Sequence, residues 1–113
     1  MTEAYAASRY EEACALLPMR LRTAALNLPL CRKAAVEELR LRIGRQLFLT
    51  APEGETALPG TMVTKNDLEQ VLDRASEYSR YAAAETMRHG YLTAAGGFRV
   101  GLCGTALPGG EIN

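Results

Sequence analysis

Charged and apolar residues alternate along the chain from Glu38 to Ile43. The apolar positions are Leu39, Leu41 and Ile43, and the charged positions are Glu38, Arg40 and Arg42. A period of two is typical of a strand with one buried face and one wet face. A short turn at Gly44-Arg45 and a second turn at residues 52–55 separate it from two further strands, over residues 46–50 and 56–58. The pattern therefore predicts a three-strand meander.

Before this strand, apolar residues recur at helical spacing. Ser8 and Glu11 fit a capping box, which predicts a helix that begins at Ser8 after a frayed start in residues 1–7. Pro18 ends that helix or opens a second one over residues 19–27, and Pro29 stops the helical segment. We therefore expect a helical hairpin or a kinked helix ahead of the meander.

The clearest amphipathic helix begins at Thr64, where Asp67 completes a second capping box. Its apolar positions are Leu68, Val71, Leu72, Ala75 and Tyr78. This spacing of three and four residues predicts a helix that covers one face of the sheet. A further helix is predicted over residues 81–89, with Gly90 as its left-handed C-cap.

Glycines are concentrated near the end of the chain, among residues that favour strands. They are Gly90, Gly96, Gly97, Gly101 and Gly104. We predict an antiparallel hairpin of residues 91–94 and 98–107, with its turn at Gly96-Gly97, and tight turns or close packing at these glycines and at Gly44. Strands and helices in separate runs predict an α+β fold, in which N-terminal helices precede a small, mostly antiparallel sheet covered by helices.

Composition limits the classes of protein to which the chain can belong. Its 113 residues suit a single domain over residues 1–113, and 48% hydrophobic with 23% charged residues excludes a disordered chain. Thirteen basic and 13 acidic residues balance, so no global charge attracts nucleic acid. The cysteines, Cys14, Cys31 and Cys103, lack metal-site spacing and are expected to be reduced. The absence of a long apolar run predicts a soluble, cytoplasmic protein.

No motif in the sequence supplies catalysis. A phosphate-binding loop needs Gly-Lys-Ser or Gly-Lys-Thr, and neither occurs. The residues from Gly101 to Gly104 match a G-x-x-G of KH domains, but they fall in a predicted strand without basic residues. His89, the only histidine, has no carboxylate or nucleophile in a recognised pattern. The sequence therefore predicts no catalytic residue, cofactor site or metal site.

Four arginines form the candidate binding set, Arg40, Arg42, Arg45 and Arg99. The first two lie on one face of a predicted strand, the third on the adjoining turn, and the last on the closing hairpin. In one interpretation they are a solvated face that Glu37, Glu38 and Glu55 balance. In the other they present guanidinium groups to a phosphate or to an acidic surface. The residues alone leave both interpretations open.

Three blocks resemble the stage III sporulation protein AA family. Residues 38–47 resemble its EIRLRxGRPL block, residues 79–104 its SxYA…GYxTxxGGHRVGxxG block, and residues 17–29 its LPxxLRxxLxxLP block. Gln46 stands where that family usually has proline, and Phe98 where it has histidine. The second departure indicates that position 98 serves packing.

That family is similar to the hexameric secretion and pilus-motor ATPases of types II and IV, in which an N-terminal α+β domain precedes a RecA-like motor domain. The resemblance implies that this chain is the N-terminal domain alone, cut within a longer protein, and not itself an enzyme. ATP and magnesium would belong to the full-length protein. Its function would be to energise the channel between mother cell and forespore from the mother-cell cytoplasm.

The implied partners are the neighbouring subunits of a homo-hexamer and stage III sporulation protein AB, through which the protein would lie peripheral to the membrane. Arg40, Arg42, Arg45 and Arg99 become candidates for contact with nucleotide or with another domain. The alternative is a small nucleic-acid-binding α+β module. Two Phe and five Tyr provide few rings on which bases could stack, so we expect no nucleic-acid partner.

Overall fold

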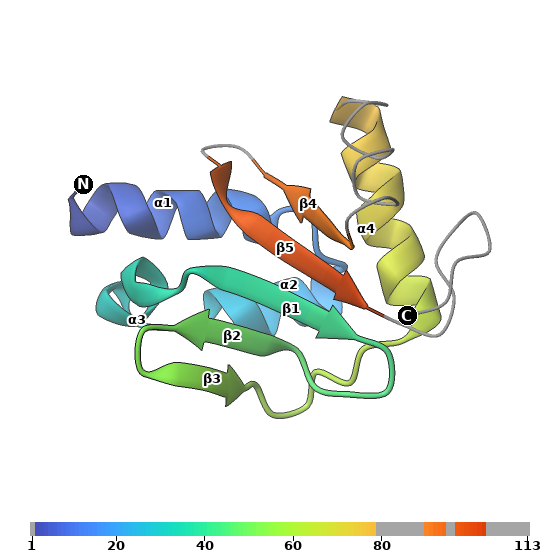
Figure 1. The fold of residues 1–113 in the computed structure, drawn as a ribbon, viewed down its shortest axis with the longest axis horizontal. Helices are drawn as coiled ribbons and strands as arrows, with labels where there is room; N and C mark the ends of the chain where they lie inside the picture. The colour runs from blue at the N-terminus through green and yellow to red at the C-terminus, as the bar shows by residue number, and fades with distance from the viewer. Residues whose placement is uncertain (1, 79–89, 95–96, 104–113) are drawn as a thin grey trace.

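One five-stranded sheet organises the chain, with its strands in the order β3-β2-β1-β5-β4 (Figure 1). A computed structural model describes residues 2–78, 90–94 and 97–103. The helices are α1 (Glu3–Cys14), α2 (Met19–Leu26), α3 (Leu30–Ala35) and α4 (Lys65–Tyr78), and the strands are β1 (Glu38–Arg42), β2 (Phe48–Ala51), β3 (Gly54–Ala57), β4 (Tyr91–Thr93) and β5 (Arg99–Cys103). The predicted α+β class is confirmed. The helix predicted over residues 81–89 lies outside the described residues.

β1 lies at the centre of the sheet and joins the two parts that the sequence predicted separately. Leu39 pairs with Leu49 of antiparallel β2 on one side and with Val100 of parallel β5 on the other. The β2–β3 and β4–β5 pairs are both antiparallel. The meander, the closing hairpin and a mostly antiparallel sheet are therefore confirmed. The parallel pairing of β1 with β5 is an addition that the sequence did not reveal.

Three strands begin at residues other than those predicted. β2 begins at Phe48 rather than at Gln46, β3 begins at Gly54 rather than at Thr56, and β5 begins at Arg99 rather than at Phe98. The segment just before β2 bonds to the loop after β3 instead of continuing the strand. The turn predicted at Gly44-Arg45 is therefore the start of a longer loop.

The first helix begins earlier than predicted. Its N-cap is Thr2, whose hydroxyl accepts a hydrogen bond from Tyr5 N at 3.1 Å. Ser8 is an exposed residue inside α1, so the predicted start at Ser8, after a frayed stretch in residues 1–7, was wrong. Thr caps a helix nearly as well as Ser, and the alanine-rich turn between the two favours helix. The helix therefore extends back to the earlier cap.

The short helix α3 was not predicted. Pro29, expected to stop the helical segment, is the N-cap of α3, with φ −67° and ψ 159°. Proline has no N–H to lose and a fixed φ, so it is tolerated where a helix starts. No residue of α3 is buried, so no apolar spacing marked it. A salt bridge of 2.7 Å between Lys33 and Glu11 ties α3 to α1.

The hydrophobic core lies on one side of the sheet. In Figure 1, α1 and α2 lie behind the strands, α4 stands at the end of the sheet, and no helix of the described residues lies in front. Tyr10 is fully buried in this core and donates its hydroxyl to Ala25 O at 2.6 Å. Phe98 is 3% exposed and packs edge-on against Tyr10, with the ring centroids 6.0 Å apart. The packing role predicted for Phe98 is confirmed.

None of the helices in the described part of the chain is long and apolar enough to cross a membrane.

Candidate functional site

The face of the sheet that points away from the helices is here called the outer face. It is formed by alternate residues of each strand, because neighbouring side chains of a strand point to opposite sides. The strand register places Arg40 between Phe48 of β2 and Gly101 of β5, and Gly101 faces Tyr91 of β4. Residues that are far apart in the sequence therefore make one continuous row across the outer face.

Two glutamates hold two of the arginines on this face. Arg40 donates from Nε to Glu38 Oε1 at 2.7 Å and from Nη1 to Glu55 Oε2 at 2.9 Å. Arg42 donates from Nη2 to the same oxygen, Glu55 Oε2, at 3.0 Å. The hydrogen bond from Arg42 lowers the pKa of Glu55, and the hydrogen bond to Glu38 raises the pKa of Arg40. Four charged groups thus form one connected network.

Aromatic rings support two of the guanidinium groups. The guanidinium carbon of Arg42 lies 5.1 Å from the ring centre of Phe48, and that of Arg99 lies 4.8 Å from the ring centre of Tyr91. Both distances fall within the range of cation–π attraction. Each arginine therefore has its side-chain direction fixed by a ring on a neighbouring strand.

A hollow of about 260 Å³ opens on the outer face beside this network. It is lined by Glu38, Arg40, Leu41, Arg42, Gly90, Tyr91, Gly101 and Leu102. Gly101 leaves the gap because it has no side chain between Arg40 and Tyr91. A Cβ at position 101 would lie 3.6 Å from Glu38 Oε2 and 3.8 Å from Arg40 Cγ, which is ordinary contact, so packing alone does not require glycine there.

The structure brings together three of the four candidate arginines. Arg40 and Arg42 project from β1, and the register places Arg99 beside Glu38 on the same face. Arg45 is exposed on the loop between β1 and β2, away from the network. Of the predicted balancing acids, Glu38 and Glu55 pair with arginines, whereas Glu37 has no ion pair within the described residues.

The candidate glycines that the structure describes fall into two groups. Gly44, Gly90 and Gly97 have φ values of 85°, 80° and 81°, which lie in the left-handed region that favours glycine. Gly101 is an ordinary strand residue that lines the hollow, while Gly96 and Gly104 lie outside the described residues.

Phe48 and Tyr91 could not be identified as members of the site from the sequence. Their only signal was an alternate position in a strand, and that signal becomes useful only once the strand register is known. A guanidinium-rich face of this kind can bind oxyanions through paired hydrogen bonds. Among the described side chains of the face, none has the geometry of a catalytic base or nucleophile.

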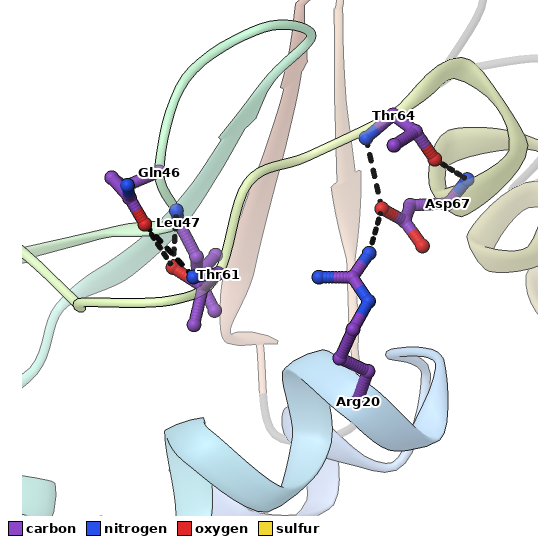
Figure 2. Close-up of polar contacts among 6 residues, drawn as sticks. All are labelled: Arg20, Gln46, Leu47, Thr61, Thr64 and Asp67. Carbon is purple, nitrogen blue, oxygen red and sulfur yellow. Dashed lines mark hydrogen bonds and ion pairs between the residues drawn. The ribbon is translucent and has the colours of Figure 1, made fainter.

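Two polar clusters fix the loops around the sheet (Figure 2). The fully buried Thr61 accepts from Leu47 N at 2.8 Å through its hydroxyl and donates to Leu58 O at 2.5 Å. Gln46 Oε1 accepts from Thr61 N at 2.8 Å. The residue that departs from the family pattern at position 46 therefore bonds the Arg45 loop to the segment that leads to α4.

The second cluster in Figure 2 starts α4. Thr64 N donates to Asp67 Oδ2 at 2.8 Å, and Asp67 N donates to Thr64 Oγ1 at 3.2 Å, so the predicted capping box is confirmed. Arg20 of α2 donates to the same Asp67 oxygen at 2.6 Å. Asp67 is only 4% exposed and thereby connects α2 to α4.

Comparison with known proteins decides the family. The sequence profile of the family described as "Sporulation stage III, protein AA" matches residues 7–111. The chain belongs to this family. It is 33% identical over 96 residues to stage III sporulation protein AA of Bacillus subtilis (strain 168), a match that covers 85% of this chain. The resemblance drawn from the sequence blocks is thus confirmed.

The chain spans 31% of the length of that Bacillus subtilis relative. No solved structure matches the chain significantly.

Proposed function

We propose that this member of the stage III sporulation protein AA family is the N-terminal assembly and regulatory domain of a secretion-type ATPase that energises the mother cell–forespore channel. The outer face is the surface through which it acts. The observation that carries the proposal is the division of the sheet: helices cover the inner face, while the opposite face presents Arg40, Arg42 and Arg99, and the first two of these line a hollow. A face of this composition suits contact with nucleotide phosphates or with an acidic surface of a neighbouring subunit.

Such a contact would couple nucleotide to domain movement. A guanidinium group that reaches phosphate only when two domains close makes the closed state more stable with nucleotide than without it. Arginines that stabilise charge on a transferred phosphoryl group work in this way in other NTPases. Arg40 and Arg42 suit the task because Glu38 and Phe48, respectively, already fix their orientation.

The proposed partners follow from the same assignment. They are the neighbouring subunits of a homo-hexamer and stage III sporulation protein AB, with the protein in the mother-cell cytoplasm and peripheral to the membrane. ATP and magnesium would be held by a motor domain elsewhere in the full-length protein. The length of the Bacillus subtilis relative, of which this chain matches 31%, supports a larger protein. The chain itself would not be an enzyme.

The test is charge reversal in the full-length protein. Replacing both Arg40 and Arg42 by glutamate should reduce ATP turnover about 10-fold or more, because like charges would then face phosphate or an acidic partner. Size-exclusion chromatography should show weaker assembly. The matched control is the pair Arg32→Glu and Lys65→Glu, which makes the same charge change at exposed positions away from the outer face.

Circular dichroism must show that both variants remain folded. If the Arg40 and Arg42 variant then assembles and hydrolyses ATP as the control does, the proposed role of the outer face is refuted.

A second candidate function is single-stranded RNA binding, which the presence of Phe48 and Tyr91 on one sheet face favours. Rings on a sheet are stacking platforms for bases. Here, however, Arg42 lies over one ring and Arg99 over the other. Filter binding at physiological salt separates the two functions: tight retention of RNA by the chain, lost in Tyr91→Ala, would favour this candidate over the ATPase domain.

A further inference from the structure

Glu55 accepts hydrogen bonds from two of the three arginines of the outer face through a single oxygen atom. Its Oε2 accepts from Arg40 Nη1 at 2.9 Å and from Arg42 Nη2 at 3.0 Å. An oxyanion that bridges two guanidinium groups in this way is the arrangement expected of a bound phosphate. The Glu55 carboxylate therefore lies where a phosphate oxygen that bridged these two guanidinium groups would lie.

The arginines do not depend on Glu55 for their orientation. Glu38 Oε1 holds Arg40 through Nε at 2.7 Å, a different nitrogen from the one that Glu55 accepts from. Arg42 lies over the ring of Phe48. If Glu55 moved away, both guanidinium groups would stay in place with N–H groups free, which lowers the entropy cost of binding another anion.

Glu55 also lies where it can move. It belongs to β3, a four-residue strand at the edge of the sheet in which every residue is exposed. Its side chain retains 34% exposure, and each of its ion pairs is partly open to solvent. Ion pairs between exposed groups are worth little, so their exchange costs little.

The hollow lies on the other side of β1 from Glu55. It is lined by Gly90 and by residues of β1, β4 and β5, whereas Glu55 belongs to β3 and the Arg42 guanidinium lies over Phe48 of β2. An anion that displaced Glu55 would therefore bind where its carboxylate lies, on the β2–β3 side of Arg40 and Arg42, and not in the hollow.

We propose that Arg40 and Arg42 form a binding site for a phosphate chain at the position that the Glu55 carboxylate occupies, and that Glu55 is its internal competitor, which neutralises Arg40 and Arg42 until phosphate takes them over. This inference rests on the proposed function, because it supplies the ligand class and the regulation of the same face. Glu38 is a positioning residue, since it holds Arg40 in both states.

The test is isothermal titration calorimetry of the chain with inorganic triphosphate at low ionic strength. Glu55→Gln removes the competing charge and keeps the size of the side chain. Since two exposed ion pairs are broken, affinity should rise about 2- to 30-fold over the unsubstituted chain. The matched control is Glu53→Gln, which removes the same charge two residues away, where no ion pair holds it within the described residues. It should change affinity less than about 2-fold.

A second variant ties the gain to the arginine pair. In the Glu55→Gln chain, a further Arg42→Gln substitution should abolish the increase. The inference is overturned if Glu55→Gln and Glu53→Gln bind triphosphate equally, if neither binds it, or if the increase persists without Arg42. The charge-reversal test in the full-length protein is independent of these results. If the outer face binds only another subunit, charge reversal would still weaken assembly and ATP turnover, but the chain would not bind triphosphate in the titration.

Discussion

Removing the carboxylate of Asp67 should destabilise the domain more than the loss of any exposed ion pair. Asp67 closes the capping box of α4 with Thr64 and accepts a short bond from Arg20. Losing its part of the cap costs about 1 kcal/mol. Losing the charge-assisted bond costs a further 1.5 kcal/mol or so, at the low end of its range because Arg20 is half exposed.

Asp67→Ala should therefore lower the free energy of unfolding by about 2–3 kcal/mol, a large part of the roughly 5–15 kcal/mol of a domain. The melting temperature should fall by roughly 8–12 °C. Urea titration followed by circular dichroism measures the change, provided that the slope with denaturant stays constant. Asp67→Asn retains an acceptor for Thr64 N and should cost only about half as much.

A double-mutant cycle with Arg20→Ala isolates the ion pair, and a coupling of about 1–2 kcal/mol is expected. A loss below about 1 kcal/mol in Asp67→Ala, or a coupling near zero, would show that Asp67 does not join α2 to α4 as described.

Three further predictions concern buried groups. Cys31 is exposed and should be alkylated rapidly by iodoacetamide in the native protein. Burial raises the pKa of Cys14 to about 12 and should protect that thiol until the protein unfolds. Mass spectrometry of labelled peptides measures both reactions, and equal labelling of the two thiols would contradict the prediction. Burial raises the pKa values of Cys14 and Tyr10, so as pH rises these groups lose their protons in the unfolded state at a lower pH than in the folded state. The free energy of unfolding should therefore fall as pH rises from about 9 towards 12. A free energy of unfolding that stays constant over this range would disprove the prediction. Thr61→Val should cost about 1–3 kcal/mol because Leu58 O loses its buried donor, and Thr61→Ser, which retains the hydroxyl, should cost less in the same urea titration.

Local patterns predicted the elements whose two faces differ in polarity. The alternation from Glu38 to Arg42 revealed β1 because one face packs on the core and the other is wet. The spacing of apolar residues after Thr64 revealed α4 for the same reason. By contrast, α3 buries no residue, so no spacing of apolar residues indicated a helix there.

The pairing of distant strands could not be predicted in this way. Nothing in the local pattern of β5 distinguishes a parallel neighbour from an antiparallel one, since the side-chain period is two in both cases. The candidate site depended on that pairing. The sequence placed Arg40 and Arg42 on one face, but the neighbours of these arginines, Gly101 and the bridging Glu55, come from register across three other strands.

The parallel contact between β1 and β5 constrains the order in which the polypeptide can fold during synthesis. β1 leaves the ribosome early, yet one of its two edges stays open until residues 99–103 follow. Closing so long a loop is entropically unfavourable, so we expect the pairing of β5 with β1 to be the slow step of folding. A nascent chain that stalls before β5 would therefore expose the backbone of its central strand, which makes it a target for chaperones and for self-association.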